Sequence, residues 1–127
     1  MTPADAPSAA ATDSDPKAPT EHWWHRMQRG ELPPPPVARL LGATIVRVDR
    51  EAGELDVDYA PRADFANPAG GVQGGMLGAM LDDLTASLVD STLAAGEAPA
   101  TVSLNLSYLR PARITPMQGR ARLMRRG

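Results

Sequence analysis

Residues 67–83 read Asn-Pro-Ala-Gly-Gly-Val-Gln-Gly-Gly-Met-Leu-Gly-Ala-Met-Leu-Asp-Asp. A glycine-rich loop passes directly into an apolar helical pattern, and an acidic pair follows about two turns later. Glycines at the start of a helix let a ligand approach the free backbone N–H groups, and the helix dipole there attracts partial negative charge. A carboxylate further along the helix can then act as a base or a nucleophile. The stretch therefore predicts an active site built on one helix.

This helix is predicted to run from Gly74 to about Ala95. Its leucines recur at spacings of four and three, namely Leu77, Leu81, Leu84 and Leu88. Such spacing makes one face of a helix strongly apolar. We therefore expect the helix to pack against a sheet.

The two acidic residues in the helix are not equivalent. Asp83 shares a stripe with Ser87 and Asp90, and we expect this polar stripe to face water. Asp82 lies on a face of small residues, which are Gly78, Ala79, Ala86 and Val89. Glycine in a helix interior costs about 1 kcal/mol relative to alanine, so Gly78 indicates close approach by another backbone or by a ligand. Asp82 is the candidate site residue, and an ordinary surface position remains the open alternative for it.

The glycine loop has an alternative interpretation of its own. Asn-Pro-x-Gly is an ordinary turn sequence, and Gly-Gly before a helix can be a simple bend. The loop is not a phosphate-binding P-loop, because no Gly-Lys-Ser/Thr closes it. It is not a dinucleotide-binding fingerprint either, because the glycine spacing differs and strands do not alternate with helices.

Period-two alternation predicts strands on both sides of the long helix. Two of them cover about Ala43–Val48 and residues 55–59, and the polar turn between them ends in glycine, which predicts a hairpin. A third covers 102–108, and a fourth begins near Gln118. The order of short helix, two strands, long helix and two strands predicts an α+β fold with one main helix packed on an antiparallel sheet.

The N-terminal part of the chain differs from the rest. Residues 1–20 are almost all Ala, Pro, Asp, Ser and Thr, so we expect a disordered N-terminal tail. Residues 21–30 predict a short helix that carries two tryptophans and ends at Gly30. Pro33 to Pro36 are expected to be extended. Residues 21–127 are then interpreted as a single domain.

The charge and composition of the chain argue against several classes of function. With 13 basic and 15 acidic residues the net charge is −2, which gives no global field for nucleic acid or a membrane surface. The absence of cysteine excludes disulfides, thiolate catalysis and cysteine-ligated zinc. No apolar run is long enough to span a membrane, and the N-terminus lacks the pattern of a secretory signal. We expect a soluble cytoplasmic protein.

Two groups of residues could suggest other ligands. His22 and His25 lie three residues apart and could share a metal, but no carboxylate or thiolate completes a site. A surface helix whose tryptophans pack on the core is expected instead. Arginines near the C-terminus could bind the phosphates of coenzyme A, although a solvent-facing position is the expected one for each. They are Arg110, Arg113, Arg120, Arg122, Arg125 and Arg126.

Asn67, Gly74-Gly75 and Asp82, at this spacing, resemble the signature of the PaaI-like hotdog-fold acyl-CoA thioesterases. The run from Thr101 to Ala112 is similar to the strand that follows the long helix in that family. The resemblance implies a hotdog fold, in which an antiparallel sheet wraps around one long helix. It also implies a homodimer or homotetramer with active sites between two chains, and hydrolysis of an acyl-CoA substrate without metal or cofactor.

The resemblance implies catalytic roles for three residues. The N–H of Gly74, at the helix start, would hydrogen-bond the thioester carbonyl and stabilise the developing oxyanion. Asp82, reaching across from the partner subunit, would activate water or attack the carbonyl itself, and both routes stay open. Asn67 would orient the loop, the water or the thioester.

Three further residues are implied in substrate binding: Gln73, Gly75 and Thr101. The family usually has histidine where this chain has Gln73. Glutamine keeps a hydrogen-bond donor and an acceptor but takes up no proton at physiological pH. Thr101 corresponds to a hydroxyl residue that assists the water in some members.

The resemblance further implies that the sheet lacks its last strands, because family members continue with about two more strands past the position of Gly127, and a sheet without them has unpaired edges. The chain would then be a shortened version of a longer protein, or it would borrow strands from a partner. The alternatives to an enzyme are a non-catalytic hotdog module, which binds acyl-CoA or only dimerises, and an incomplete fragment.

Overall fold

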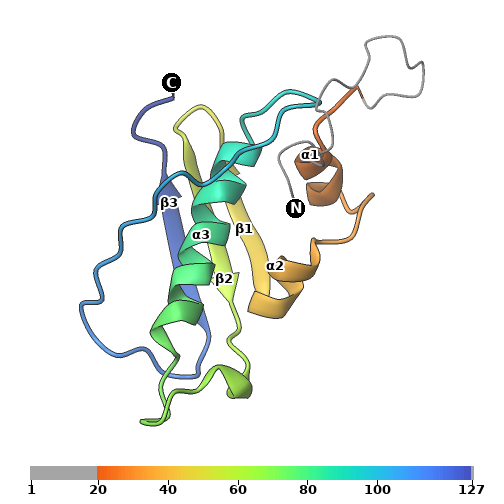
Figure 1. The fold of residues 1–127 in the computed structure, drawn as a ribbon. Coiled ribbons are helices and arrows are strands. Elements are labelled where there is room, and N and C mark those ends of the chain that lie inside the picture. The colour runs from red at the N-terminus through yellow and green to blue at the C-terminus, as the bar shows by residue number, and fades with distance from the viewer. Residues whose placement is uncertain (1–19, 127) are drawn as a thin grey trace, which may run out of the picture.

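The computed structural model describes residues 20–126, so the tail predicted for residues 1–20 lies, except for its last residue, outside the described residues. The elements in chain order are α1 (Trp23–Gln28), α2 (Pro36–Leu41), β1 (Ala43–Asp49), β2 (Glu54–Tyr59), the short 3-10 helix η2 (Ala63–Phe65), α3 (Gly74–Asp90) and β3 (Met117–Arg122). The long helix α3 lies across one face of the sheet, with α1 and α2 on its β1 side (Figure 1). This arrangement confirms the predicted α+β class.

Within residues 20–126 the sheet has three antiparallel strands in the order β1-β2-β3. β1 and β2 form the predicted hairpin, with Ala43 opposite Tyr59 and Asp49 opposite Glu54. Gly53 precedes β2 with a φ of 67°, a conformation that glycine adopts without steric cost. The first, second and fourth predicted strands are therefore confirmed.

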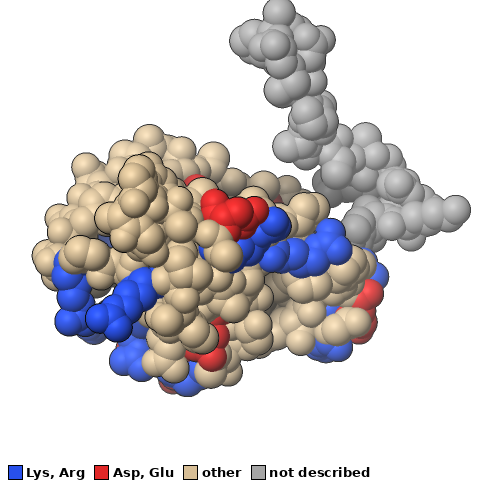
Figure 2. Space-filling view, turned by 90° about the horizontal axis from the view of Figure 1, so that it is seen from below, with Lys and Arg blue, Asp and Glu red and all other residues tan. Residues whose placement is uncertain are grey.

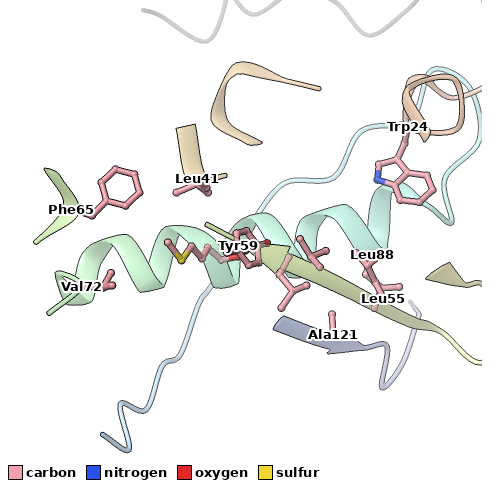
Figure 3. Close-up of a cluster of buried hydrophobic side chains, with 11 residues drawn as sticks. Trp24, Leu41, Leu55, Tyr59, Phe65, Val72, Leu88 and Ala121 are labelled. Atoms are coloured by element: carbon pink, nitrogen blue, oxygen red, sulfur yellow. Dashed lines mark hydrogen bonds between the residues drawn. The ribbon is translucent and has the colours of Figure 1, made fainter. Parts of the chain in front are cut away.

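The hydrophobic core lies between α3 and the sheet (Figure 3). Met80, Leu84 and Leu88 of α3 are at most 4% exposed, whereas Leu81, at the margin of the predicted apolar face, is 38% exposed. The core residues of α3 meet inward-facing residues of β2 and β3, which are Leu55, Val57, Tyr59 and Ala121. A Cβ on Gly119 of β3 would lie 2.9 Å from Leu84 Cδ2. Glycine at this position lets the helix approach the sheet closely.

Helix α1 confirms the predicted short helix. His22 is its N-cap, and the His22 Nδ1 accepts a hydrogen bond from the Trp24 N–H at 3.3 Å. Trp24 is fully buried, whereas Trp23 is 39% exposed. The expectation that both tryptophans pack in the core therefore holds for Trp24 and fails for Trp23.

Helix α2 is absent from the sequence-based expectations, which placed Pro36 in an extended segment. Pro36 is instead the first residue of α2. Proline suits this position because its fixed φ matches the first turn, where its missing N–H has no helical partner. The prolines before it, Pro33 to Pro35, belong to no helix or strand, and Pro35 has a ψ of 152°.

Helix α3 ends at Asp90, earlier than the predicted end near Ala95. The hydroxyl groups of Ser91 and Thr92 donate to backbone carbonyls three residues earlier, at 2.6 and 2.7 Å. Local side-chain hydrogen bonds of this kind compete with continued helix. Among the described residues, no helix combines the length and the apolar character needed to cross a membrane.

The third predicted strand is wrong for the described structure, because residues 102–108 belong to no strand. This segment runs past α3 as an extended connection and stays apart from β3 in Figure 1. Val102 and Leu109 are 96% and 93% exposed. A strand needs a neighbouring backbone for its hydrogen bonds, and within residues 20–126 none pairs with this segment. Alternation in the sequence does not by itself supply that neighbour.

Candidate active site

Asn67 anchors the loop that precedes α3. Its Oδ1 accepts hydrogen bonds from the N–H groups of Ala69 and Gly71, both at 3.0 Å. The Asn67 backbone N–H also donates to the Gly71 carbonyl at 2.7 Å. A Cβ on Gly71 would lie 2.8 Å from the Ala112 carbonyl oxygen, so glycine permits the contact between this loop and the chain before β3. The side-chain oxygen of Asn67 is thus directed at backbone groups of its own loop.

The first N–H groups of α3 are free for a ligand. Gln73 is the N-cap residue, but its side chain makes no capping hydrogen bond and is exposed. Among residues 20–126, no acceptor pairs with the N–H of Gly74 or Gly75. A Cβ on Gly75 would meet no atom within 4 Å. The helix therefore presents two N–H groups and the positive end of its dipole to an incoming oxygen.

Asp82 lies about two turns further along α3. Its Oδ1 accepts a hydrogen bond from Thr101 Oγ1 at 2.6 Å, which links the helix to the segment that follows it. Asp82 is half-buried and Thr101 is exposed. The structure thus brings together two of the predicted site residues that are 19 positions apart in the sequence.

Residues of the 101–108 segment cover the small-residue face of α3. A Cβ on Gly78 would lie 3.0 Å from Leu106 Cδ1. The Tyr108 hydroxyl donates to the Gly74 carbonyl at 2.8 Å. The close approach expected at Gly78 therefore comes from a side chain rather than from a backbone or a ligand.

Gly74 and Asp82 do not converge within one chain. They are eight residues apart, and an α-helix rises 1.5 Å per residue, so the two positions lie about 12 Å apart along the axis. A carbonyl oxygen that accepts from the Gly74 N–H is thus out of reach of Asp82 on the same helix. The predicted site residues fall into two groups, one at the helix start with Asn67, Gln73, Gly74 and Gly75 and one in its middle with Asp82 and Thr101.

Asp83 is not the solvent-facing residue that the helical pattern predicts. The Tyr59 hydroxyl donates to Asp83 Oδ2 at 2.8 Å and to the Met80 carbonyl at 3.1 Å. Burial raises the pKa of the Asp83 carboxyl above its ordinary value, while the Tyr59 hydrogen bond opposes the rise. The spacing identifies the residues that share this face, but it does not show that Tyr59 of β2 contacts them.

The other two residues of the same stripe are also covered. The Trp24 Nε1 donates to Ser87 Oγ at 3.0 Å, and His22 Nε2 lies 3.6 Å from Asp90 Oδ1. Asp90 is 7% exposed, and this burial raises the pKa of its carboxyl. The expectation that the stripe faces water is wrong because the N-terminal residues around α1 pack over it.

A cavity of about 970 Å³ lies between α1, α2, β1 and α3. Its lining includes Trp23, Met27, Val37 and Val48 on the apolar side and Asp82, Asp83, Ser87 and Asp90 on the side of α3. The volume falls in the range of small-molecule sites. This cavity was not predicted from the sequence. The polar stripe of α3 and the tryptophan-bearing helix were both visible in the sequence, but nothing there indicated that they face each other.

Solved structures identify the family of the chain. No protein-family model and no curated protein sequence matches it. A phenylacetic acid degradation-related protein from Ralstonia eutropha JMP134, to which thioesterase activity has been ascribed, is 57% identical with a TM-score of 0.81. The match covers 83% of this chain and 80% of that chain. The chain belongs to the PaaI-like hotdog thioesterase family.

Two more distant relatives of this PaaI-like chain share its fold. The PaaI protein of the E. coli phenylacetic acid degradation operon is 23% identical, with a TM-score of 0.63 over 81% of this chain and 72% of that one. Thioesterase superfamily member 2 from Mus musculus is 19% identical, with a TM-score of 0.60 over 84% of this chain and 72% of that one. The expected hotdog fold is therefore confirmed.

The arginines considered for coenzyme A differ in their surroundings within residues 20–126. Figure 2 shows basic side chains in separate groups, some of them beside acidic ones. Arg120 and Arg47 donate to the Asp56 carboxylate at 2.9 and 3.1 Å. Arg126 donates to the Thr92 carbonyl at 2.6 Å. Arg120 and Arg126, two of the arginines considered for coenzyme A, are thus engaged within the chain.

Proposed function

We propose that the chain hydrolyses an acyl-CoA thioester to a free acid and CoA. The observation that carries the proposal is the pair of N–H groups at Gly74 and Gly75 that have no partner within residues 20–126, on the same helix as an Asp82 carboxylate held by Thr101. N–H donors at a helix start stabilise an oxyanion, and a positioned carboxylate activates water or attacks a carbonyl. Membership of a thioesterase family supports this combination of groups.

Each active site is proposed to use two chains. Because Gly74 and Asp82 are about 12 Å apart on one helix, a thioester held at Gly74 requires the Asp82 of a second copy. The segment 101–108 supports association, since its backbone groups are unpaired within residues 20–126 and Val102 is exposed. A homodimer completes the site, and a homotetramer of such dimers preserves it. A cytoplasmic location, where acyl-CoA is available, belongs to the same proposal.

In the proposed reaction the thioester carbonyl oxygen accepts a hydrogen bond from the Gly74 N–H. Negative charge develops on that oxygen as the carbonyl carbon becomes tetrahedral. Asp82 removes a proton from the attacking water, or attacks the carbonyl carbon to form an anhydride that water then cleaves. The C–S bond breaks, and the sulfur leaves with its electron pair and takes up a proton to give CoA. Thr101 holds the Asp82 carboxylate in position by its hydrogen bond.

Gln73 and Gly75 are proposed to bind the thioester, and Asn67 is proposed to hold the loop that precedes them. The exposed Gln73 amide lies next to the unpaired N–H groups and can donate or accept one hydrogen bond to the substrate. Because an amide does not ionise, this role excludes proton transfer by Gln73. Gly75 leaves space for the substrate, and Asn67 holds the loop through its bonds to Ala69 and Gly71.

The acyl group is proposed to enter the cavity between α1, α2, β1 and α3. Asp82 lines this cavity, so a thioester carbonyl beside Asp82 can extend its acyl chain inward. Apolar side chains such as Trp23 and Met27 line the opposite side and would remove an alkyl or aryl group from water.

Replacement of Asp82 tests the proposed function. Purified protein should hydrolyse at least one member of an acyl-CoA panel, and Asp82→Ala should lower kcat by about 10²- to 10⁴-fold, because the group that activates the nucleophile is lost. Asp58→Ala is the matched control, since it removes an exposed carboxylate on β2 and should leave the rate unchanged.

Equal rates in the wild type and Asp82→Ala would contradict the role of Asp82. Calorimetric binding of an acyl-CoA without turnover would instead favour a non-catalytic hotdog module. Gln73 is the observation that favours this second candidate, because glutamine accepts no proton at the position where the resemblance expects histidine.

A further inference from the structure

Tyr108 holds the first turn of α3 from outside the helix. Its hydroxyl donates to the Gly74 carbonyl at 2.8 Å, across 34 positions of sequence. Gly74 is the first residue of α3. Its carbonyl oxygen has two lone pairs, so it can accept the tyrosine hydroxyl as well as an N–H of the helix itself. A side chain from the segment after α3 is thus bonded to the backbone at the proposed oxyanion site.

Two glycines about one helical turn apart make room for the Tyr108 side chain. A Cβ on Gly74 would lie 3.6 Å from Tyr108 Cζ, and a Cβ on Gly78 would lie 3.6 Å from the Tyr108 hydroxyl oxygen. Both distances are ordinary van der Waals contacts, so a side chain longer than that of alanine would displace the tyrosine. The two glycines therefore let the tyrosine hydroxyl reach the Gly74 carbonyl.

The Tyr108 hydrogen bond also fixes the direction of the Gly75 N–H. The Gly74 carbonyl and the Gly75 N–H belong to one peptide group, which is planar and trans. A donor on the carbonyl oxygen therefore restrains the N–H at the other end of the same group. The bond also polarises the peptide group, because hydrogen bonds in a chain strengthen one another. The Gly75 N–H becomes a better oriented and stronger donor.

The peptide group between Gly74 and Gly75 needs this support more than the group before it. Glycine has the greatest backbone freedom of any residue, and Gln73 makes no side-chain capping bond. The Gln73 carbonyl accepts two backbone N–H groups of α3, at 2.9 and 3.2 Å, so the helix itself orients the Gly74 N–H. Outside the helix, the Gly74 carbonyl receives its donor from Tyr108.

We propose that Tyr108 is a positioning residue that orients the Gly75 N–H as a second donor to the oxyanion, beside the Gly74 N–H. The first N–H groups of a helix point away from its start in a similar direction, so one oxygen can accept from both. The inference rests on the proposed function, since it takes the helix start as the place of the thioester carbonyl. The same segment of chain holds Asp82 through Thr101, so it supports both groups of the proposed site.

Tyr108→Phe tests this role, because it removes the hydroxyl and keeps the ring. With the acyl-CoA that the wild type hydrolyses fastest, kcat should fall about 3- to 10-fold, the size expected for one neutral hydrogen bond. KM should stay the same, because the oxyanion exists only in the transition state. Thr92→Val is the matched control. It removes a hydroxyl that donates to the Val89 carbonyl at the other end of α3, and it should leave kcat and KM unchanged.

Nuclear magnetic resonance detects the same hydrogen bond without turnover. Gly-Gly pairs occur at residues 70–71 and 74–75, so protein labelled with [1-13C,15N]glycine gives one HNCO peak for each pair. Tyr108→Phe should move the Gly74 carbonyl 13C resonance to lower frequency, because the carbon loses a deshielding hydrogen bond while the aromatic ring is kept. The peak of the 70–71 pair is the internal control and should stay in place.

Ketone analogues of the acyl-CoA panel, with CH2 in place of the thioester sulfur, separate the inference from hydrolysis. At least one of them should move the Gly75 N–H proton resonance to higher frequency in the wild type, and by less in Tyr108→Phe. These shifts without turnover of any acyl-CoA would support the inference and contradict hydrolysis.

Two results would overturn the inference. A Gly75 resonance that every ketone analogue leaves in place would remove the second donor. A wild-type kcat in Tyr108→Phe, or an equal loss in Thr92→Val, would remove the positioning role of Tyr108.

Discussion

Asp90 illustrates how one buried carboxyl couples folding to pH. Burial raises its pKa, the nearby His22 opposes the rise and Asp83 adds to it. A raised pKa means that the folded state favours the protonated form. The stability contributed by this group is therefore fully present below the unfolded-state pKa, near 3.8, and is lost as the pH rises through the higher folded-state pKa.

Asp90→Asn should remove the loss of stability at high pH, because the amide keeps the shape of the side chain and carries no charge. We expect the free energy of unfolding of the variant to exceed that of the wild type at pH 7.5, with a smaller difference at pH 4. Urea unfolding at the two pH values measures this. Asp58→Asn, at an exposed position, should show no such pH-dependent gain. A variant that loses more stability at pH 7.5 than at pH 4 would show that the carboxylate is stabilising.

Among the connections between elements, the junction of α2 and β1 depends on Gly42. This residue caps α2 with a φ of 65°, and its N–H bonds to the carbonyls of Ala38 and Arg39. The Gly42 carbonyl in turn accepts the Ala60 N–H at 3.0 Å. A Cβ on Gly42 would overlap the Ala60 carbonyl oxygen. The same glycine therefore ends one element and allows the chain after β2 to lie against it.

Gly42→Ala should destabilise the protein more than Gly30→Ala. Gly30 also has a positive φ, 80°, but a Cβ there would meet no atom within 4 Å. We expect Gly30→Ala to cost about 1–2 kcal/mol for the left-handed backbone and Gly42→Ala to cost about 1–3 kcal/mol more because the packed backbone must move. Thermal or urea unfolding of both variants measures the difference. Equal losses of stability in the two variants would show that the backbone at Ala60 moves away from the new Cβ without cost.

Elements with a local pattern could be predicted from the sequence, and those that depend on distant partners could not. The β1–β2 hairpin and the start of α3 follow from alternation, a glycine turn and a glycine-rich loop. The 102–108 segment alternates equally well, but a strand also requires a neighbour. The stripe of Asp83, Ser87 and Asp90 was assigned to water because its covering residues lie more than 20 positions away in the chain. The cavity was missed for the same reason.

For the whole molecule, the decisive quantity is the separation of the two halves of the proposed site. Gly74 and Asp82 lie on one rigid helix, about 12 Å apart. In a symmetric dimer, Gly74 of each chain can meet Asp82 of the other. The assembly is then part of the chemistry as well as of the stability.

Mixed dimers test this assignment. Gly74→Pro removes the proposed N–H donor at the first helical position, where proline is tolerated, and Asp82→Ala removes the carboxylate. Each variant alone should be inactive. When the two chains are co-expressed, about a quarter of the wild-type activity should return, because half of a random mixture is mixed dimer with one intact site.

Differently tagged chains allow the mixed dimer to be purified and assayed by itself. Sedimentation of each variant confirms that it still associates. No recovered activity in a pure mixed dimer would place Gly74 and Asp82 in the same site of the same chain, or remove one of them from the mechanism.

The eight-residue separation of Gly74 and Asp82 also limits how this part of the gene can change. Each residue added to a helix turns everything beyond it by about 100°. One inserted codon between these positions would move Asp82 away from Thr101 and toward a different side of α3. Point substitutions there can be neutral, whereas a change of length breaks the geometry at once. Insertions and deletions accepted by the lineage should therefore lie in the loops on either side of α3.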